Sequence, residues 1–291
     1  MAEATIGIIG GSGLYQMPGL SDPQEVRLRT PFGDPSDAYV VGTLQGRQVA
    51  FLARHARGHR ISPSELNFRA NIYGFKLLGV ERLISVGAVG SLHERHRPLD
   101  LVIPNQFVDR TKGRIDTFFR DGIVAHVSMA DPVCAGLAAS LAEAAQAAGL
   151  DPHVGGIYLC MEGPAFSTRA ESELYRSWGM DVIGMTNFQE AKLAREAELC
   201  YATLAFVTDY DCWHVSEEKV SAEMVITNLL KNVQNAQALI TQAVRTLPPQ
   251  GDCPCGRALE QALVTDLKLV PKGQRSALRP IIGKYLERAG L

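Results

Sequence analysis

Two carboxylates stand one residue apart at the end of an apolar run: Asp209 and Asp211, with Tyr210 between them. In an extended strand, side chains two residues apart point to the same side, so both acids are expected to face one small volume where the strand leaves the core. Like charges held there are costly, so a pair of this kind needs a reason. For an isolated pair a plain turn is the commoner explanation, and the remainder of the sequence must decide.

A glycine-rich turn follows the first apolar run, in the segment Gly7-Ile-Ile-Gly-Gly-Ser-Gly13. The N–H groups of such a turn point outward and can bind phosphate oxygens, and the hydroxyl of Ser12 adds a donor. The segment is not a P-loop, since no Gly-Lys-Ser/Thr follows, and Gln16 stands where a dinucleotide fingerprint needs its third glycine. It predicts either an anion site or a simple tight turn.

Two further loops with anion-binding groups also follow apolar runs. Residues 53–60 form a basic loop that contains Arg54 and His55, and residues 87–91 form a second glycine-containing turn. Ligands gather beyond the carboxyl ends of the strands in an open parallel sheet, so these loops and the first turn are expected to face one phosphate. A solvated charged loop is the alternative for residues 53–60.

The segment 162–171 offers groups suited to a planar ring. Phe166 could stack on such a ring while Ser167 hydrogen-bonds its edge. In the alternative interpretation, Ser167 or Thr168 caps the helix that follows and Phe166 packs in the core. The residues alone leave both open.

These loops belong to a regular alternation of strands and helices. Short β-rich apolar runs are expected to form strands at residues 5–9, 39–44, 48–52, 83–89, 101–103, 156–160, 181–185 and 202–208. Helix formers at helical spacing occupy residues 64–78, 132–148, 188–199 and 222–244. The pattern predicts an α/β fold: a single domain, 1–246, with a central mixed, largely parallel β-sheet flanked by helices. A Pro- and Gly-rich linker then begins a helical C-terminal tail, 247–291, packed on or trailing the domain.

Composition points to small-molecule ligands. The net charge of −2 and the 21% charged residues leave no basic excess for nucleic acid or an anionic membrane surface. The sequence opens on no secretory leader and contains no apolar run of membrane-spanning length, so a cytoplasmic location is expected.

The six cysteines predict no metal site. Cys134, Cys160, Cys200 and Cys212 sit singly in apolar surroundings, where a reduced core thiol is the usual explanation. Only Cys253-Pro254-Cys255 is spaced for metal or redox chemistry, and a structural zinc site needs a second such pair or nearby histidines.

Six motifs, in this order and at these separations, resemble the trimeric purine nucleoside phosphorylase family and, within it, the S-methyl-5′-thioadenosine phosphorylases: GIIGGSGL, LARHARGH, GAVGSL, EGPAFSTRAES, GMTNFQEAKLARE and TDYDCW. The match runs from about residue 5 to about residue 244. The resemblance implies a nucleoside phosphorylase fold and a phosphorolysis that splits methylthioadenosine with inorganic phosphate. It also implies no cofactor, a part in purine and methionine salvage, and a homo-oligomer, either a trimer or a dimer of trimers.

The resemblance also assigns the phosphate site. By position, the family's phosphate contacts fall on Ser12, Arg54, His55, Gly87 with Ala88, and Thr186. It implies a bidentate contact from Arg54, with N–H and O–H donors around it, that holds the nucleophile by position and charge. The chain has Gly87 where adenine-specific relatives usually have threonine, so one hydroxyl donor is missing.

The base contacts fall on Phe166, Ser167 and the Asp209-Tyr210-Asp211 segment, with Met185 along the sugar. A purine departs more easily when N7 is protonated, and two acids in a half-dry pocket can share a proton, so one donates while the other accepts. Asp209 is expected to donate to N7, with Asp211 orienting it. Relatives that cleave 6-oxopurine nucleosides have asparagine at the place of Asp209, so the acid indicates a 6-amino base.

The 5′ end of the nucleoside is expected to meet apolar groups from the long C-terminal helix. The positions implied are Ala222, Val225 and Ile226, near Ser167, and a methylthio group buries well against such residues. His126 matches a residue that the family donates across a subunit boundary. The alternatives are a methylthioinosine or 6-oxopurine nucleoside phosphorylase of the same fold, a non-catalytic nucleoside-binding protein and, more distantly, a dehydrogenase.

Overall fold

The structure, a computed structural model, describes residues 4–11, 13–14, 16–214 and 222–291, without the side chains of 222–226. Its centre is a set of parallel strands. β1 (Ile6–Gly10) lies between β4 (Arg47–Ala53) and β5 (Arg82–Ser91), and β11 (Cys200–Asp209) runs parallel to β5 on the other side. β1 and β11 are buried along their whole length because both of their faces are covered.

Antiparallel strands extend the sheet at several places. β3 (Tyr39–Leu44) pairs with β4 and with β2 (Ser21–Val26), while β10 (Val182–Gly184) runs antiparallel to β5. The remaining strands are β6 (Leu101–Ile103), β7 (Gln106–Arg110), β8 (Pro152–Val154) and β9 (Ile157–Met161). Six of the ten strand pairs among the described residues are parallel, so the predicted mixed, largely parallel sheet is confirmed.

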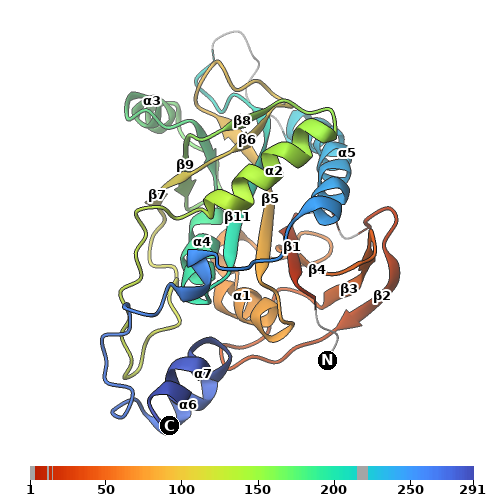
Figure 1. Cartoon of the computed structure of the whole chain (residues 1–291). Coiled ribbons are helices and arrows are strands. Elements are labelled where there is room, and N and C mark those ends of the chain that lie inside the picture. The colour runs from red at the N-terminus through yellow and green to blue at the C-terminus, as the bar shows by residue number, and fades with distance from the viewer. Residues whose placement is uncertain (1–3, 12, 15, 215–221) are drawn as a thin grey trace.

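Helices cover both faces of the sheet, as Figure 1 shows. α2 (Ala135–Ala147) and α5 (Ala222–Thr246) pack on one face, and α1 (Phe68–Leu77) and α4 (Asn187–Glu196) on the other. Alternate residues of β4 enter the two cores, because successive side chains of a strand point to opposite sides. α3 (Arg169–Ser177) begins at a capping box formed by Thr168 and Glu171.

The segment after residue 246 returns to the α1 face. It contains the short helix η2 (Pro254–Arg257), α6 (Lys272–Ala277) and α7 (Arg279–Arg288). Leu259, Leu278 and Ile282 are fully buried there in the core that α1 and α4 share with the sheet (Figure 1). Among the described residues, no helix is long and apolar enough to cross a membrane.

Candidate active site

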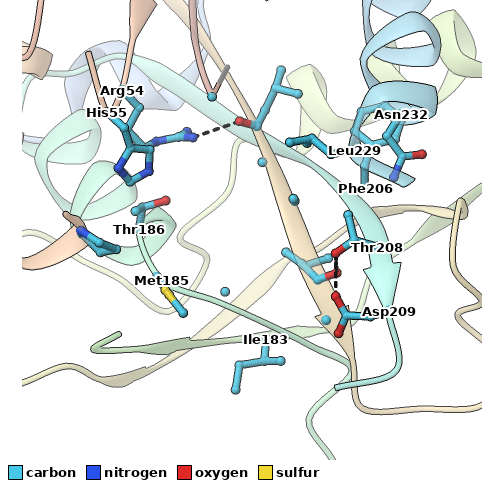
Figure 2. A pocket seen from close by; sticks show the side chains of 18 of the residues that line it. Arg54, His55, Ile183, Met185, Thr186, Phe206, Thr208, Asp209, Leu229 and Asn232 are labelled. Carbon is cyan, nitrogen blue, oxygen red and sulfur yellow. Dashed lines mark hydrogen bonds between the residues drawn. The ribbon is translucent and has the colours of Figure 1, made fainter. Parts of the chain in front are cut away.

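The carboxyl ends of the central strands surround a cavity of about 360 Å³. Arg54, His55 and Thr186 lie at one side of it, and Thr208 and Asp209 lie at the other, as Figure 2 shows. The first group carries hydrogen-bond donors suited to an anion, and the second carries carboxylate chemistry. The strand order of the sheet thus brings together the separate loops noted in the sequence.

Arg54 is held by a buried carboxylate. Its Nε donates to Glu190 Oε1 over 2.5 Å and its Nη2 donates to Glu190 Oε2 over 3.1 Å, while Nη1 donates to the Val86 carbonyl over 3.0 Å. The Nε and Nη2 edge of Arg54 therefore meets Glu190 in this structure, and the expected bidentate contact of Arg54 with phosphate stays a prediction. Nη1 has a second N–H and lies beside Gly87, so Arg54 can still donate once into the cavity.

His55 is neutral at neutral pH. Burial, followed by the charge of Arg54, lowers its pKa to about 4. Its Nδ1 lies 2.8 Å from the Ile61 carbonyl oxygen, and a carbonyl only accepts, so Nδ1 carries the proton. Nε2 is then an acceptor, suited to a protonated oxygen of a phosphate. His59, which the sequence analysis did not assign, stacks on the His55 ring at 4.4 Å and lines the same cavity.

Thr186 is the N-cap of α4 and lines the cavity. The N-terminus of this ten-residue helix presents N–H groups and positive dipole charge, which favour an anion. Gly87 and Ala88 also line the cavity, while Ser12 lies outside the described residues. A Cβ built on Gly87 would meet its nearest atom, Asn187 Oδ1, at 3.7 Å, so a Cβ fits there in ordinary van der Waals contact.

Asp209 and Asp211 line the same cavity, but not through simple strand alternation. The pairing of β11 with β5 shifts register between Val207 and Asp209, and β11 ends at Asp209. Asp211 follows in a turn with a φ of 52°, in the left-handed region. The Asp211 N–H donates to Asp209 Oδ1 over 2.8 Å, so the second acid orients the first through its main chain.

The carboxyl of Asp211 is poorly solvated. Burial raises its pKa, and its Oδ2 is buried with no hydrogen-bond partner among the described residues. Gly90 leaves room for the pair, because a Cβ there would lie 3.1 Å from Asp209 Oδ1 and 3.4 Å from Asp211 Cβ. A side chain at this position of the neighbouring strand would therefore crowd the acid end of the cavity.

Thr208 is a residue that the sequence analysis missed. Its Oγ1 lies 2.7 Å from Asp209 Oδ2 and 3.2 Å from the Val89 carbonyl oxygen. One hydroxyl has one proton, so it donates either to an ionised Asp209 or to Val89; in the second case it can accept from a protonated Asp209. Both charge states of Asp209 are thereby accommodated.

The other predicted site residues are placed as follows. Phe166, 56% exposed, and Met185 both line the cavity. Ser167 is buried and its Oγ donates to Met161 Sδ over 3.7 Å, whereas Tyr210 stacks on His214; neither is among the cavity-lining residues. His126 is exposed, its N–H donates to the Ala262 carbonyl, and it lies away from the cavity of its own chain.

The apolar wall from the long helix is present. The side chains of Ala222, Val225 and Ile226 lie outside the described residues, and the cavity is lined two turns further along α5 by Leu229, Asn232, Val233 and Ala236. These positions follow the same helical periodicity, which could have identified them from the sequence. Asn232 donates from Nδ2 to the Val207 carbonyl over 3.0 Å and ties α5 to β11.

A cavity at the strand ends, with an anion-binding side facing a carboxylate side, defines an enzyme of the α/β class that brings a small anion to a polar, ring-containing substrate. The chain belongs to the phosphorylase superfamily, whose model matches residues 5–245. Phosphate is a substrate for this family, and the predicted fold is confirmed.

Individual relatives narrow the comparison. The chain is 62% identical over 290 residues to S-methyl-5′-thioadenosine phosphorylase of Koribacter versatilis, which covers 99% of both proteins. A crystal structure of methylthioadenosine phosphorylase from an antarctic soil metagenomic library is similar to this chain, with a TM-score of 0.93 and 52% sequence identity. The match covers 97% of this chain and 99% of the other. A methylthioadenosine phosphorylase from Schistosoma mansoni in complex with adenine gives a TM-score of 0.82 at 35% identity, over 89% and 98% of the chains.

Proposed function

We propose that this chain catalyses the phosphorolysis of S-methyl-5′-thioadenosine by inorganic phosphate, which yields adenine and 5-methylthioribose 1-phosphate. The observation that carries the proposal is one cavity with Arg54, His55 and Thr186 at one side and Asp209 and Asp211 at the other. The relatives that share most of its length bear this activity in their names. The reaction is that of a pentosyltransferase.

The phosphate side holds the nucleophile. A phosphate oxygen attacks C1′ of the ribose while the bond from C1′ to N9 breaks and its electron pair moves into the purine. Arg54 Nη1 and the N-terminus of α4 stabilise the anion, and neutral His55 accepts from a protonated phosphate oxygen. Catalysis at this side depends on position and charge, so we propose that no cofactor takes part.

The acid side removes the leaving group. Asp209 donates a proton to N7 and thereby neutralises the charge that develops on the departing adenine. The Asp211 N–H fixes Asp209 Oδ1. Thr208 accepts a hydrogen bond from Oδ2 while Asp209 is protonated, and donates one to Oδ2 after Asp209 has given its proton to N7. A carboxyl at this place also favours the 6-amino group of adenine over a 6-oxo group.

The 5′ methylthio group packs against the apolar face of α5, where Leu229, Val233 and Ala236 line the cavity. By the family pattern, Ala222, Val225 and Ile226 continue this wall, Ser167 borders it, and His126 reaches it from a neighbouring subunit. This contribution would make a homotrimer, or a dimer of trimers, part of the active site. The trimer and the cytoplasmic location stay predictions.

The test is an adenine-release assay on purified protein with methylthioadenosine, with and without phosphate. The parent, Asp209→Asn and Asp151→Asn, an exposed aspartate outside the cavity, are compared. Phosphate-dependent release by the parent and by Asp151→Asn, with a loss of about 10²-fold or more in Asp209→Asn, is expected, since general acid catalysis contributes about that factor. Unchanged activity in Asp209→Asn would remove Asp209 from the mechanism, and faster cleavage of inosine or methylthioinosine would overturn the specificity.

A further inference from the structure

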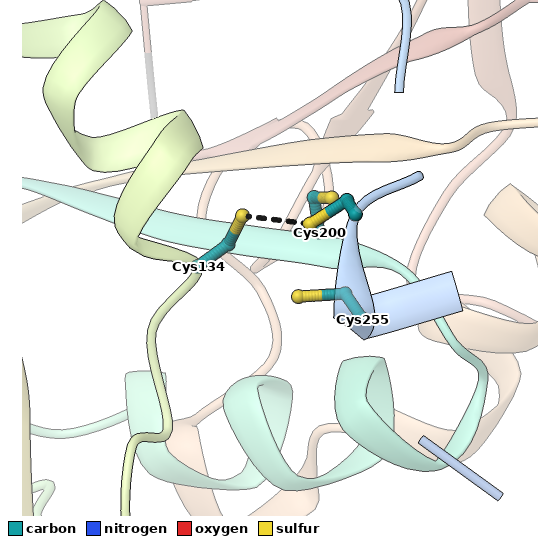
Figure 3. A group of neighbouring side chains, drawn as sticks. Cys134, Cys200 and Cys255 are labelled. Atoms are coloured by element: carbon teal, nitrogen blue, oxygen red, sulfur yellow. Dashed lines mark hydrogen bonds between the residues drawn. The ribbon is translucent and has the colours of Figure 1, made fainter. Parts of the chain in front are cut away.

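Four cysteines from distant parts of the chain meet at the end of β11 opposite to the cavity. Cys134 caps α2, Cys200 is the first residue of β11, and Cys253 and Cys255 belong to the segment after residue 246. Their four sulfur atoms all lie within 4.8 Å of one another, and Cys134 Sγ is 3.6 Å from Cys253 Sγ. Figure 3 shows the side chains of Cys134, Cys200 and Cys255 gathered close together, between the start of α2, β11 and the segment after residue 246.

The spacing fits four ligands of one ion. A zinc–sulfur bond of about 2.3 Å in a tetrahedron places neighbouring sulfurs about 3.8 Å apart. This value lies between the 3.6 Å that separates Cys134 Sγ from Cys253 Sγ and the 4.8 Å within which all four sulfur atoms lie. A disulfide would need about 2.05 Å between two sulfurs, and none of the six cysteines is disulfide-bonded in the structure.

The surroundings of the cluster are those of a closed site. Cys134, Cys200 and Cys255 are buried, and Cys253 is half-buried. The Leu137 N–H donates to Cys134 Sγ over 3.4 Å, and Gln250 Nε2 donates to Cys200 Sγ over 3.5 Å, which are contacts that orient and stabilise thiolate ligands.

A buried cation also faces this end of the sheet. Arg82 stands opposite Cys200 in the parallel pairing of β5 and β11, so both side chains leave the sheet on the same face. Arg82 is 7% exposed, its Nη2 donates to the Pro249 carbonyl over 2.6 Å, and its Nε is buried without a hydrogen-bond partner among the described residues. A guanidinium at this position offsets the negative charge that four metal-bound thiolates carry.

We propose that Cys134, Cys200, Cys253 and Cys255 bind one zinc ion in a structural site. Four thiolates select a soft, tetrahedral ion, and the tight sulfur spacing favours a single ion over a cluster. Binding releases the thiol protons to solvent and leaves a site with no open position, so the ion takes no part in the phosphorolysis. It connects the segment after residue 246 to α2 and to β11.

This proposal replaces the expectation that the chain holds no metal. The close spacing of Cys253 and Cys255 was visible in the sequence. Their partners are distant, because Cys134 lies 119 residues and Cys200 lies 53 residues before Cys253. Only the fold supplies the second pair.

The test uses the full chain, produced with zinc in the medium and purified under reducing conditions without chelator. Elemental analysis is expected to find one zinc per chain in the parent and in Cys160→Ala, a control cysteine in another core cluster. The double variant Cys253→Ser/Cys255→Ser is expected to lose the metal and to unfold at a lower temperature. Because this variant could fail to fold, the parent is also reconstituted with cobalt, whose tetrahedral thiolate absorption reports the ligands directly.

Thiols are counted in the denatured parent after the reductant has been removed. Six thiols together with one bound zinc support the proposal. Two thiols, the number left when all four cluster cysteines form disulfides, overturn it, as do six thiols with no stoichiometric uptake of zinc or cobalt. None of these readouts uses activity, so they do not depend on the proposed reaction.

Discussion

Glu190 grips Arg54 through both carboxylate oxygens, at 2.5 Å to Nε and 3.1 Å to Nη2, and both side chains are buried. Ser85 joins the pair, because Arg54 Nη2 donates to its Oγ over 2.6 Å while that hydroxyl donates to Glu190 Oε2 over 2.8 Å. Arg54 is therefore fixed before any anion binds, so its side chain loses little conformational entropy when phosphate binds.

Removal of Glu190, the buried partner of Arg54, should strongly destabilise the fold. We expect Glu190→Ala to lower the free energy of unfolding by about 3–5 kcal/mol, because it leaves an unpaired buried charge. Glu287→Ala, which breaks the exposed 3.9 Å pair with Arg279, should cost under about 1 kcal/mol. Denaturant unfolding of both variants measures the difference, and equal stabilities would show that Glu190 does not stabilise the fold through Arg54.

Thr208→Val should slow the reaction without loss of the fold. The variant loses the hydroxyl beside Asp209 Oδ2, and a hydrogen bond to a charged group contributes about 1.5–3 kcal/mol, so kcat/KM is expected to fall about 10- to 100-fold. Thr208→Ser keeps the hydroxyl and should retain most of the activity. Steady-state adenine release measures both, and similar losses in valine and serine variants would assign the effect to packing.

Gly87→Thr should strengthen phosphate binding. The position lines the cavity, and a Cβ there meets its nearest atoms in ordinary van der Waals contact, at 3.7 and 4.0 Å, so we expect threonine to add a hydroxyl donor there. One additional hydrogen bond to an anion corresponds to a KM for phosphate about ten-fold lower. Gly87→Ala supplies the Cβ without the hydroxyl and is the matched control. A higher KM in the threonine variant would contradict the prediction.

His55 should make stability depend on acid pH. Burial lowers its pKa from 6.5 in the unfolded chain to about 4 in the folded chain, so between these values only the unfolded state binds the proton. Stability from this group is complete above about pH 6.5 and falls by about 3 kcal/mol as the pH drops through 4. His55→Asn keeps a donor for the Ile61 carbonyl but does not titrate. The unfolding free energy of the parent minus that of the variant should therefore rise between pH 4 and 7.

The sequence was sufficient where function depends on the order of strand-end loops. Arg54, Thr186 and Asp209 each stand at the end of an apolar run. β4 and β11 belong to the parallel core of the sheet, whereas β10 runs antiparallel to β5, and the ends of all three strands meet at one cavity. The resemblance placed an apolar face of α5 at the 5′ end of the nucleoside, and helical periodicity could have extended that face to Leu229, Val233 and Ala236, which line the cavity.

Other features depended on packing that no local pattern encodes. Glu190 lies 136 residues after Arg54 in the sequence. No local pattern could therefore show that the Nε and Nη2 groups of Arg54 are already hydrogen-bonded to a carboxylate. The turn at Asp211 requires a left-handed backbone, which strand alternation does not foresee. The Cys134 and Cys200 thiols met their partners only because the chain returns to the sheet after residue 246.

Because the segment after residue 246 completes the core on the α1 face, this core can close only at the end of protein synthesis. Leu259, Leu278 and Ile282 complete the core over α1, and they leave the ribosome only after all eleven strands of the described part of the chain have been made. Until these residues dock, the nascent sheet exposes a large apolar surface to solvent, and a growing chain with such a surface is prone to aggregate.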